Sequence, residues 1–156
     1  MADLPISRFP VPDIADLPED LRARILAVQE KAGFVPNVFL ALAHRPAEWR
    51  AFFAWHDALM DKEEGLSKAE RELIVVATSA LNRCLYCVVA HGALLRIYSK
   101  RPLLADQAAT NWRKADLSAR ERLIVEFAVK VCEQADTIEE ADLERLRAGG
   151  LTDDEI

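Results

Sequence analysis

Two stretches of the chain share one helix-starting pattern, and this repetition constrains the fold more than any other sequence feature. Residues 66–71 and 117–122 both read Leu-Ser-x-x-Glu-Arg, and an apolar run follows each of them. A serine followed three residues later by glutamate is a capping box, which satisfies free backbone N–H groups in the first turn of a helix. The pattern predicts two matching helices, either as copies of one duplicated unit or as two helices that merely share a capping box.

The remaining sequence after residue 18 also favours helices, and no alternating strand pattern bounded by turn residues occurs. Besides the helix that Ser67 begins, we expect helices over residues 19–31, 46–61, 83–98, 103–112, 118–134 and 139–147. Asn82 is the expected N-cap of the helix over 83–98. The chain is therefore predicted to be all-α, with a single helical domain over residues 19–156.

The two ends of the sequence carry their own signals. Residues 1–18 contain four of the seven prolines, which predicts an extended arm rather than a helix. Residues 151–156 read as the N-terminus of a further helix, so we expect a C-terminal helix to continue from this point.

Composition excludes several classes of partner. With 20 Lys and Arg against 26 Asp and Glu, the net charge is -6, and no basic cluster is present to neutralise a nucleic-acid backbone. The N-terminus lacks the apolar core of a signal peptide, and no apolar run is long enough to cross a bilayer. We therefore expect a cytoplasmic protein with neither nucleic-acid nor membrane partners. Three cysteines are too few for a disulfide framework, which favours a catalytic or metal-binding use of a Cys-x-x-Cys pair.

The main candidate site is the Cys84-x-x-Cys87-x-x-x-His91 segment at the start of an expected helix. At about 100° per residue, its three side chains project from one stripe of that helix. Free N–H groups at a helix start favour a thiolate, and an imidazole four residues from Cys87 can take or return its proton. Glu72, on the preceding buried helix, is a candidate member of the same proton relay.

Other interpretations of these residues remain open. Packing alone explains many cysteines, and we expect Cys132 to be a core residue. Zinc could be bound by the two cysteines and His91 with Glu72 as the fourth ligand, although structural zinc sites usually draw their ligands from two separated segments. We therefore predict no metal. His44 and His56 have no partners nearby in the sequence and are expected to be surface or packing residues.

The arrangement Glu72-x11-Cys84-x2-Cys87-x3-His91 resembles the alkylhydroperoxidase D-like (AhpD-like) members of the carboxymuconolactone decarboxylase superfamily, with the best match to the peroxidase-related branch. The resemblance covers about residues 66–98. It implies an all-α fold with a duplicated helical unit, in homo-oligomers that are helix-swapped or tightly packed. It also implies a hydroperoxide reductase that uses no haem, flavin or metal cofactor.

By this resemblance, Cys87 becomes the sulfenic acid, while Cys84 resolves it and meets an external dithiol or lipoyl-type reductant. Glu72 and His91 form the proton relay. The best-known members carry a second histidine immediately before the second cysteine, and this chain has Tyr86 there. Because tyrosine has a pKa of about 10, it does not readily shuttle protons at neutral pH.

The leading functional prediction is a cofactor-independent thiol peroxidase, or a related thiol-disulfide oxidoreductase, that reduces a hydroperoxide through the Cys-x-x-Cys pair. One alternative is a carboxymuconolactone decarboxylase-like lyase that acts on a small lactone, since the superfamily includes such enzymes. Another is a non-enzymatic helical assembly module whose thiols sense redox state. Helix position alone favours Cys84 as the more activated thiol, whereas the resemblance assigns the peroxide-reacting role to Cys87.

Overall fold

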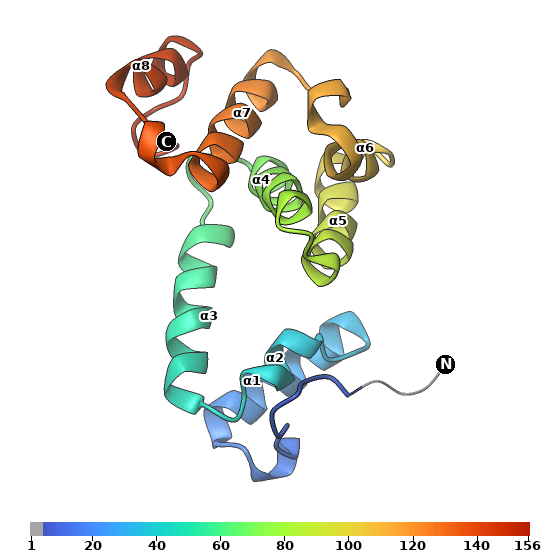
Figure 1. Cartoon of the computed structure of the whole chain (residues 1–156). Helices are drawn as coiled ribbons and strands as arrows, with labels where there is room; N and C mark the ends of the chain where they lie inside the picture. Colours follow the sequence, from blue (N-terminus) through green and yellow to red (C-terminus); the bar gives the residue numbers. More distant parts are fainter. Residues whose placement is uncertain (1–4) are drawn as a thin grey trace. The chain divides into compact units, whose positions relative to one another are not determined.

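A computed structural model describes residues 5–156, and within them the chain is all-helical, with no strand (Figure 1). The all-α prediction is therefore confirmed. The α-helices are α1 Glu19–Ala32, α2 Asn37–Ala41, α3 Pro46–Met60, α4 Lys68–Leu81, α5 Leu85–Ser99, α6 Leu104–Asn111, α7 Ala119–Glu133 and α8 Glu140–Ala148. Three short 3-10 helices complete the set: η1 Ile14–Asp16, η2 Trp112–Lys114 and η3 Ala135–Thr137.

The predicted N-terminal arm differs from the structure at one place. Residues 1–4 lie outside the described part of the chain, and residues 5–13 form no helix. Ile14–Asp16 forms the 3-10 helix η1, because Asp13 accepts a hydrogen bond from the backbone N–H of Ala15 at 3.0 Å and caps this turn. The arm therefore ends in a short helix.

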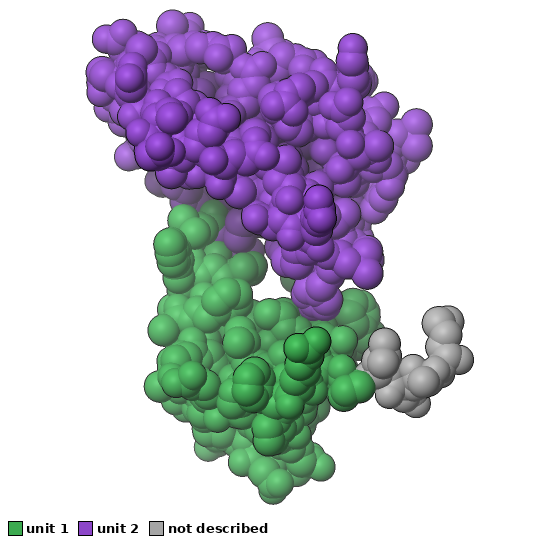
Figure 2. Space-filling model, viewed as in Figure 1, with its two compact units in different colours: residues 1–59 green, residues 60–156 purple. Residues whose placement is uncertain are grey.

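The chain divides into two compact units, residues 1–59 and residues 60–156 (Figure 2). In the first unit, α1 and α3 contribute the buried residues Leu21, Ile25, Trp49 and Phe53. The indole N–H of Trp49 donates to the Phe39 carbonyl at 3.0 Å, which satisfies its buried polar atom. Whether residues 19–156 form a single domain stays a prediction.

In the second unit, α4 packs against α5, α6 and α7. Leu73 and Val76 on α4, Leu95 on α5 and Val125 on α7 are each completely buried where these helices meet. As its apolar sequence predicts, α4 is the central helix of this unit.

The repeated Leu-Ser-x-x-Glu-Arg pattern has the same structural role at both positions. Ser67 with Glu70 and Ser118 with Glu121 each form a complete capping box, at the starts of α4 and α7. The arginine that follows each box anchors the loop before its helix. Arg71 donates to the carbonyl of Lys62 at 2.5 Å, and Arg122 donates to the carbonyl of Ala115 at 3.3 Å. The two boxes and the two loop anchors together favour the duplicated-unit interpretation.

Among the described residues, no helix combines the length and apolarity that a membrane span requires.

Candidate active site

A sharp reversal between α4 and α5 places the cysteine pair at a helix N-terminus. The prediction that Asn82 caps α5 is wrong, because Asn82 is the C-cap of α4 and Cys84 is the N-cap of α5. Arg83 has a φ of 54°, in the left-handed region, and turns the chain between the two helices. The backbone N–H of Cys84 donates to the Ser79 carbonyl at 2.9 Å and fixes this turn to the end of α4.

The N-cap position changes the acidity of Cys84. Its sulfur lies 2.7 Å from the sulfur of Cys87 and accepts the backbone N–H of Cys87 at 3.4 Å. The hydrogen bond from the Cys87 thiol, followed by the one from the Cys87 backbone, lowers the pKa of Cys84 below its usual value. Cys84 is therefore the more acidic thiol, as its helix position predicts.

The pKa of Cys87 is shifted in the opposite direction. Burial is the main reason that its pKa lies above the usual value, and the hydrogen bond and negative charge of Cys84 raise it further. A hydrogen bond from the Ser79 side chain partly offsets this increase. Of the two thiols, Cys84 therefore loses its proton more readily, and Cys87 holds its proton more tightly.

Both cysteines are free thiols in the structure. A disulfide has a sulfur–sulfur bond of about 2.05 Å, so the pair at 2.7 Å needs only a small further approach to close one. The two sulfurs are therefore close enough to form a disulfide.

Glu72 and His91 form the second pair of the site. Nδ1 of His91 lies 2.7 Å from Oε2 of Glu72, with Glu72 on α4 and His91 on α5. The carboxylate is almost completely buried, at 6% exposed, whereas the imidazole is 22% exposed. The buried carboxylate thus orients a partly exposed imidazole one helical turn beyond Cys87 on the same face of α5.

The structure therefore brings the four residues singled out from the sequence together as two contacting pairs, Cys84 with Cys87 and Glu72 with His91. Sequence reasoning missed Ser79. A signal was present, because Ser79 follows Glu72 by seven positions on α4 and so lies on the same face of that helix.

The prediction for Cys132 is wrong, because this thiol is exposed rather than buried in the core. It lies at the C-terminal end of α7, where the Asn82 amide donates to its sulfur at 3.3 Å. The last turn of α7 extends past its buried residues, which end at Val129. His56 has a partner that sequence reasoning overlooked, since its Nδ1 lies 3.1 Å from the adjacent Asp57 carboxylate.

Within residues 5–156, no group of three or more His, Cys, Asp or Glu side chains is arranged to hold a metal ion. The fold and the site define a class of protein: an all-helical protein with a dithiol at the start of a helix that also carries an imidazole paired with a buried carboxylate.

Comparisons with known proteins identify this class. Residues 46–102 match the Carboxymuconolactone decarboxylase family. A crystal structure described as an alkylhydroperoxidase AhpD core, of an uncharacterized peroxidase-related protein from Ralstonia eutropha JMP134, is 65% identical with a TM-score of 0.95. The match covers 97% of this chain and 80% of that one.

A second similar structure is an uncharacterized peroxidase-related protein from Silicibacter sp. TM1040, which is 41% identical with a TM-score of 0.89. The match covers 96% of this chain and 78% of that chain. No protein in the curated set matches the sequence. The chain belongs to the carboxymuconolactone decarboxylase family, among its AhpD-like, peroxidase-related proteins.

Proposed function

We propose that this protein is a cofactor-independent thiol peroxidase that reduces hydroperoxides through Cys84 and Cys87, with an external dithiol or lipoyl-type reductant as the electron donor. The observation that carries this proposal is the 2.7 Å separation of two free sulfurs, one of which has a lowered pKa at a helix N-terminus. The names of the two similar structures, which include alkylhydroperoxidase and peroxidase-related protein, support the same chemistry.

The first step uses the unequal acidity of the two thiols. As Cys87 attacks the terminal oxygen of the hydroperoxide, its proton passes to the Cys84 thiolate across the hydrogen bond between them. A sulfur–oxygen bond forms, the oxygen–oxygen bond breaks, and the departing alkoxide takes the proton that Cys84 has received, which leaves Cys84 as a thiolate again. The products are an alcohol and a sulfenic acid on Cys87.

The second step closes the disulfide. The Cys84 thiolate attacks the sulfur of the Cys87 sulfenic acid, and hydroxide leaves as water after it takes a proton from the relay. The external dithiol then reduces the disulfide by thiol–disulfide exchange, with Cys84 as the more exposed point of attack. One cycle converts a hydroperoxide and a dithiol into an alcohol, water and an oxidised dithiol.

Three further features belong to this proposal. The helix that bears the cysteines exposes Leu85, Val89 and Ile97, which are 77%, 62% and 64% exposed and suit burial in a homo-oligomer. Tyr86 replaces the second histidine of the best-known members, so His91 and Glu72 are left to carry the relay. A dithiol cycle of this kind operates in a reducing compartment, which fits a cytoplasmic location.

The experiment is a turnover assay with an organic hydroperoxide and either dithiothreitol or dihydrolipoamide. We expect the wild type to consume the hydroperoxide catalytically, Cys87→Ser to be inactive, and the matched control Cys132→Ser to retain full activity. A wild type that consumes no hydroperoxide with any dithiol would refute the peroxidase function.

The family description itself supports a second candidate, a carboxymuconolactone decarboxylase-like lyase that acts on a small lactone. The two candidate functions differ in whether they require the thiols of Cys84 and Cys87. Decarboxylation that persists in the Cys84→Ser/Cys87→Ser double variant would favour the lyase. A wild type that shows no decarboxylation would exclude the lyase function.

A further inference from the structure

The turn that joins α4 to α5 has the hydrogen bonds of a Schellman motif, a common way for a helix to end. Arg83 occupies the left-handed position of this motif, with a φ of 54°. Its backbone N–H donates to the Ala80 carbonyl at 3.0 Å, and the N–H of Cys84 donates to the Ser79 carbonyl at 2.9 Å. The motif therefore ends α4 and places Cys84 at the start of α5.

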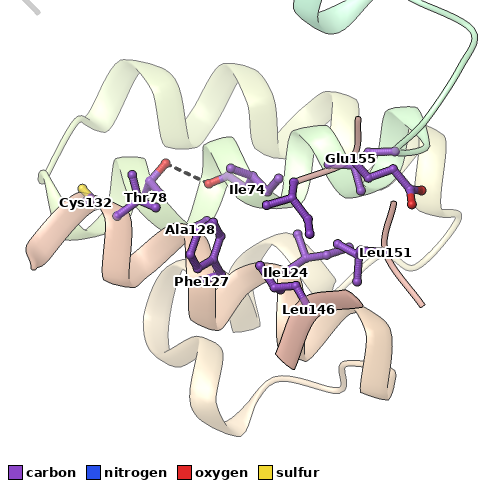
Figure 3. Close-up of a pocket in the computed structure, with 12 residues that line it drawn as sticks. Ile74, Thr78, Ile124, Phe127, Ala128, Cys132, Leu146, Leu151 and Glu155 are labelled. Carbon is purple, nitrogen blue, oxygen red and sulfur yellow. Dashed lines mark hydrogen bonds between the residues drawn. The ribbon is translucent and has the colours of Figure 1, made fainter. Parts of the chain in front are cut away.

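Side-chain contacts hold the same turn to the rest of its unit. The Asn82 amide donates to the Thr78 carbonyl at 3.0 Å and to the Cys132 sulfur at 3.3 Å. Thr78 and Cys132 lie together at one end of an apolar pocket that is lined by residues of α4 and α7 (Figure 3). Because Asn82 contacts both helices, the backbone of the adjacent Arg83 is held in position.

A left-handed backbone at an arginine costs free energy that a glycine would not incur, because the Cβ atom crowds the backbone there. Glycine is the usual residue at this position of a Schellman motif. Among the described residues, only Arg83 and Lys100 are non-glycine residues with a positive φ. Backbone strain of this kind is common at functional sites, and Arg83 directly precedes Cys84. The Arg83 side chain therefore needs an explanation other than the turn itself.

The charge of Arg83 stands alone in its part of the chain. Its side chain is exposed, and no carboxylate within the described residues lies at ion-pair distance from it. It is the only charged side chain between Glu72 and Arg96, with His91 counted as neutral, whereas 29% of the whole sequence is charged. The first turn of α5 has no acidic residue. The segment that bears the dithiol thus presents a single positive charge, in a protein whose net charge is -6.

A cation beside a reactive sulfur attracts a reactant that carries negative charge, because it steers the approach and pairs with the charge at contact. In the proposed cycle, Cys84 is the sulfur that the external dithiol attacks, and a free lipoyl-type dithiol ends in a carboxylate. We propose that Arg83 is a specificity-determining residue that recognises a carboxylate on the dithiol reductant. This inference rests on the proposed function for its dithiol cycle, and it narrows the electron donor to the anionic class.

The test measures the reductive half of the cycle by itself. Diamide takes two hydrogens from the reduced protein and forms the Cys84–Cys87 disulfide. One thiolate of the added dithiol attacks Cys84 and releases the Cys87 thiolate, and its second thiolate then displaces Cys84 as the reductant closes into a ring. Dihydrolipoate and dihydrolipoamide are matched probes, since they differ only in a terminal carboxylate or amide. Rapid quenching and mass spectrometry give the two second-order rate constants.

We expect the wild type to react about fivefold faster with dihydrolipoate than with dihydrolipoamide, which is the effect of one exposed ion pair. Both rates are corrected for the reactivity of each dithiol with uncharged 2-hydroxyethyl disulfide. Arg83→Gln should remove the preference and Arg83→Lys should keep it. High salt should weaken the preference of the wild type, because it screens exposed charges.

Lys100→Gln is the matched control. Lys100 is also exposed and left-handed, but it is the C-cap of α5, at the end of the helix away from the dithiol. Its substitution removes the same charge and should keep the preference. Loss of the preference in Lys100→Gln would overturn the proposal, since the effect would then come from net charge alone.

Equal rates with the two reductants in the wild type, or an unchanged preference in Arg83→Gln, would also overturn the proposal. The result does not depend on hydroperoxide turnover. A protein that reduces no hydroperoxide but shows the preference would refute the peroxidase function and leave the role of Arg83 intact.

Arg83→Gly separates recognition from the turn and covers the case in which Arg83→Gln fails to fold. Glycine keeps the left-handed backbone without the side chain. We expect this variant to lose the preference for dihydrolipoate while it unfolds at no lower urea concentration than the wild type. A variant that keeps the preference would contradict recognition by the Arg83 side chain, and one that is less stable would contradict the strain at this position.

Discussion

The imidazole of His91 is held by a carboxylate from another helix, with Nδ1 of His91 2.7 Å from Oε2 of the buried Glu72. This contact fixes the orientation of the ring, because α4 and α5 are themselves packed tightly on one another. The other ring nitrogen, Nε2, is the one that exchanges protons with the dithiol or with a substrate in the proposed mechanism. A positioned acid–base group of this kind typically contributes about 10²-fold to 10⁴-fold in rate.

The first prediction concerns this contact. Glu72→Gln keeps the volume of the side chain but removes its charge, so we expect peroxidase turnover to fall by about 10²-fold. The control is Glu126→Gln on α7, whose carboxylate pairs with Arg145 away from the site and whose loss should leave turnover unchanged. Wild-type turnover in Glu72→Gln would show that the relay has no role in the reaction.

The second prediction concerns the acidity of Cys84. Because the largest cause of its lowered pKa is the hydrogen bond from the Cys87 thiol, Cys87→Ala should raise the pKa of Cys84 toward its usual value. The pH dependence of iodoacetamide labelling at Cys84, followed by peptide mass spectrometry, measures this shift. An unchanged profile in Cys87→Ala would mean that the helix start alone sets the acidity.

The third prediction tests Ser79, which the sequence reasoning did not single out. Its hydrogen bond to Cys87 opposes the increase in pKa that burial causes. Ser79→Ala should therefore raise the pKa of Cys87 further and slow its labelling near neutral pH, whereas Ser79→Thr, which keeps the hydroxyl, should restore the wild-type profile. If Ala and Thr behave alike, the hydroxyl does not act on the sulfur.

The fourth prediction uses the two capping boxes. Ser67→Ala and Ser118→Ala each remove an N-cap acceptor, at the starts of α4 and α7, and each should lower the free energy of unfolding by about 1 kcal/mol. Urea unfolding followed by circular dichroism measures both values. A change within error for either variant would show that the capping box contributes nothing at that helix.

The fifth prediction concerns acid stability. Burial by itself would raise the pKa of Glu70, but hydrogen bonds from Ser67 and Arg120 outweigh it and hold the pKa below the usual 4.5. A lowered folded-state pKa stabilises the protein fully above the unfolded-state pKa, and this stabilisation is lost as pH falls through the folded-state value. Glu70→Gln should therefore be less stable than wild type at pH 7, by about 1 kcal/mol, and the difference should disappear in acid. A difference that stays constant down to pH 3 would contradict the charge-based account.

The sequence predicted the helices well because their signals are local. The capping boxes at Ser67 and Ser118 and the proline at the start of α3 each determine a helix start through contacts within one turn. The spacing of Cys84, Cys87 and His91 on one helix likewise fixes their shared face without tertiary information.

The incorrect predictions concern tertiary geometry. Asparagine is a residue type that is favoured at helix N-caps, but the left-handed turn at Arg83 makes Cys84, and not Asn82, the N-cap of α5. The exposure of Cys132 depends on how far α7 extends past its packed neighbours, which periodicity alone does not reveal. The sequence placed Glu72 and His91 on adjacent helices. It could not predict their hydrogen bond, because the distance between the two side chains depends on how α4 packs on α5.

The central claim is that Cys84 and Cys87 act together as a redox pair, and a single-turnover experiment tests it most directly. One equivalent of an organic hydroperoxide is added to the fully reduced protein, and intact and peptide mass spectrometry follow the cysteines. We expect stoichiometric loss of hydroperoxide with loss of two hydrogens from the protein, located in a Cys84–Cys87 disulfide, while Cys132 stays reduced. Consumption of hydroperoxide without this bond, or a protein that remains fully reduced, would contradict the account.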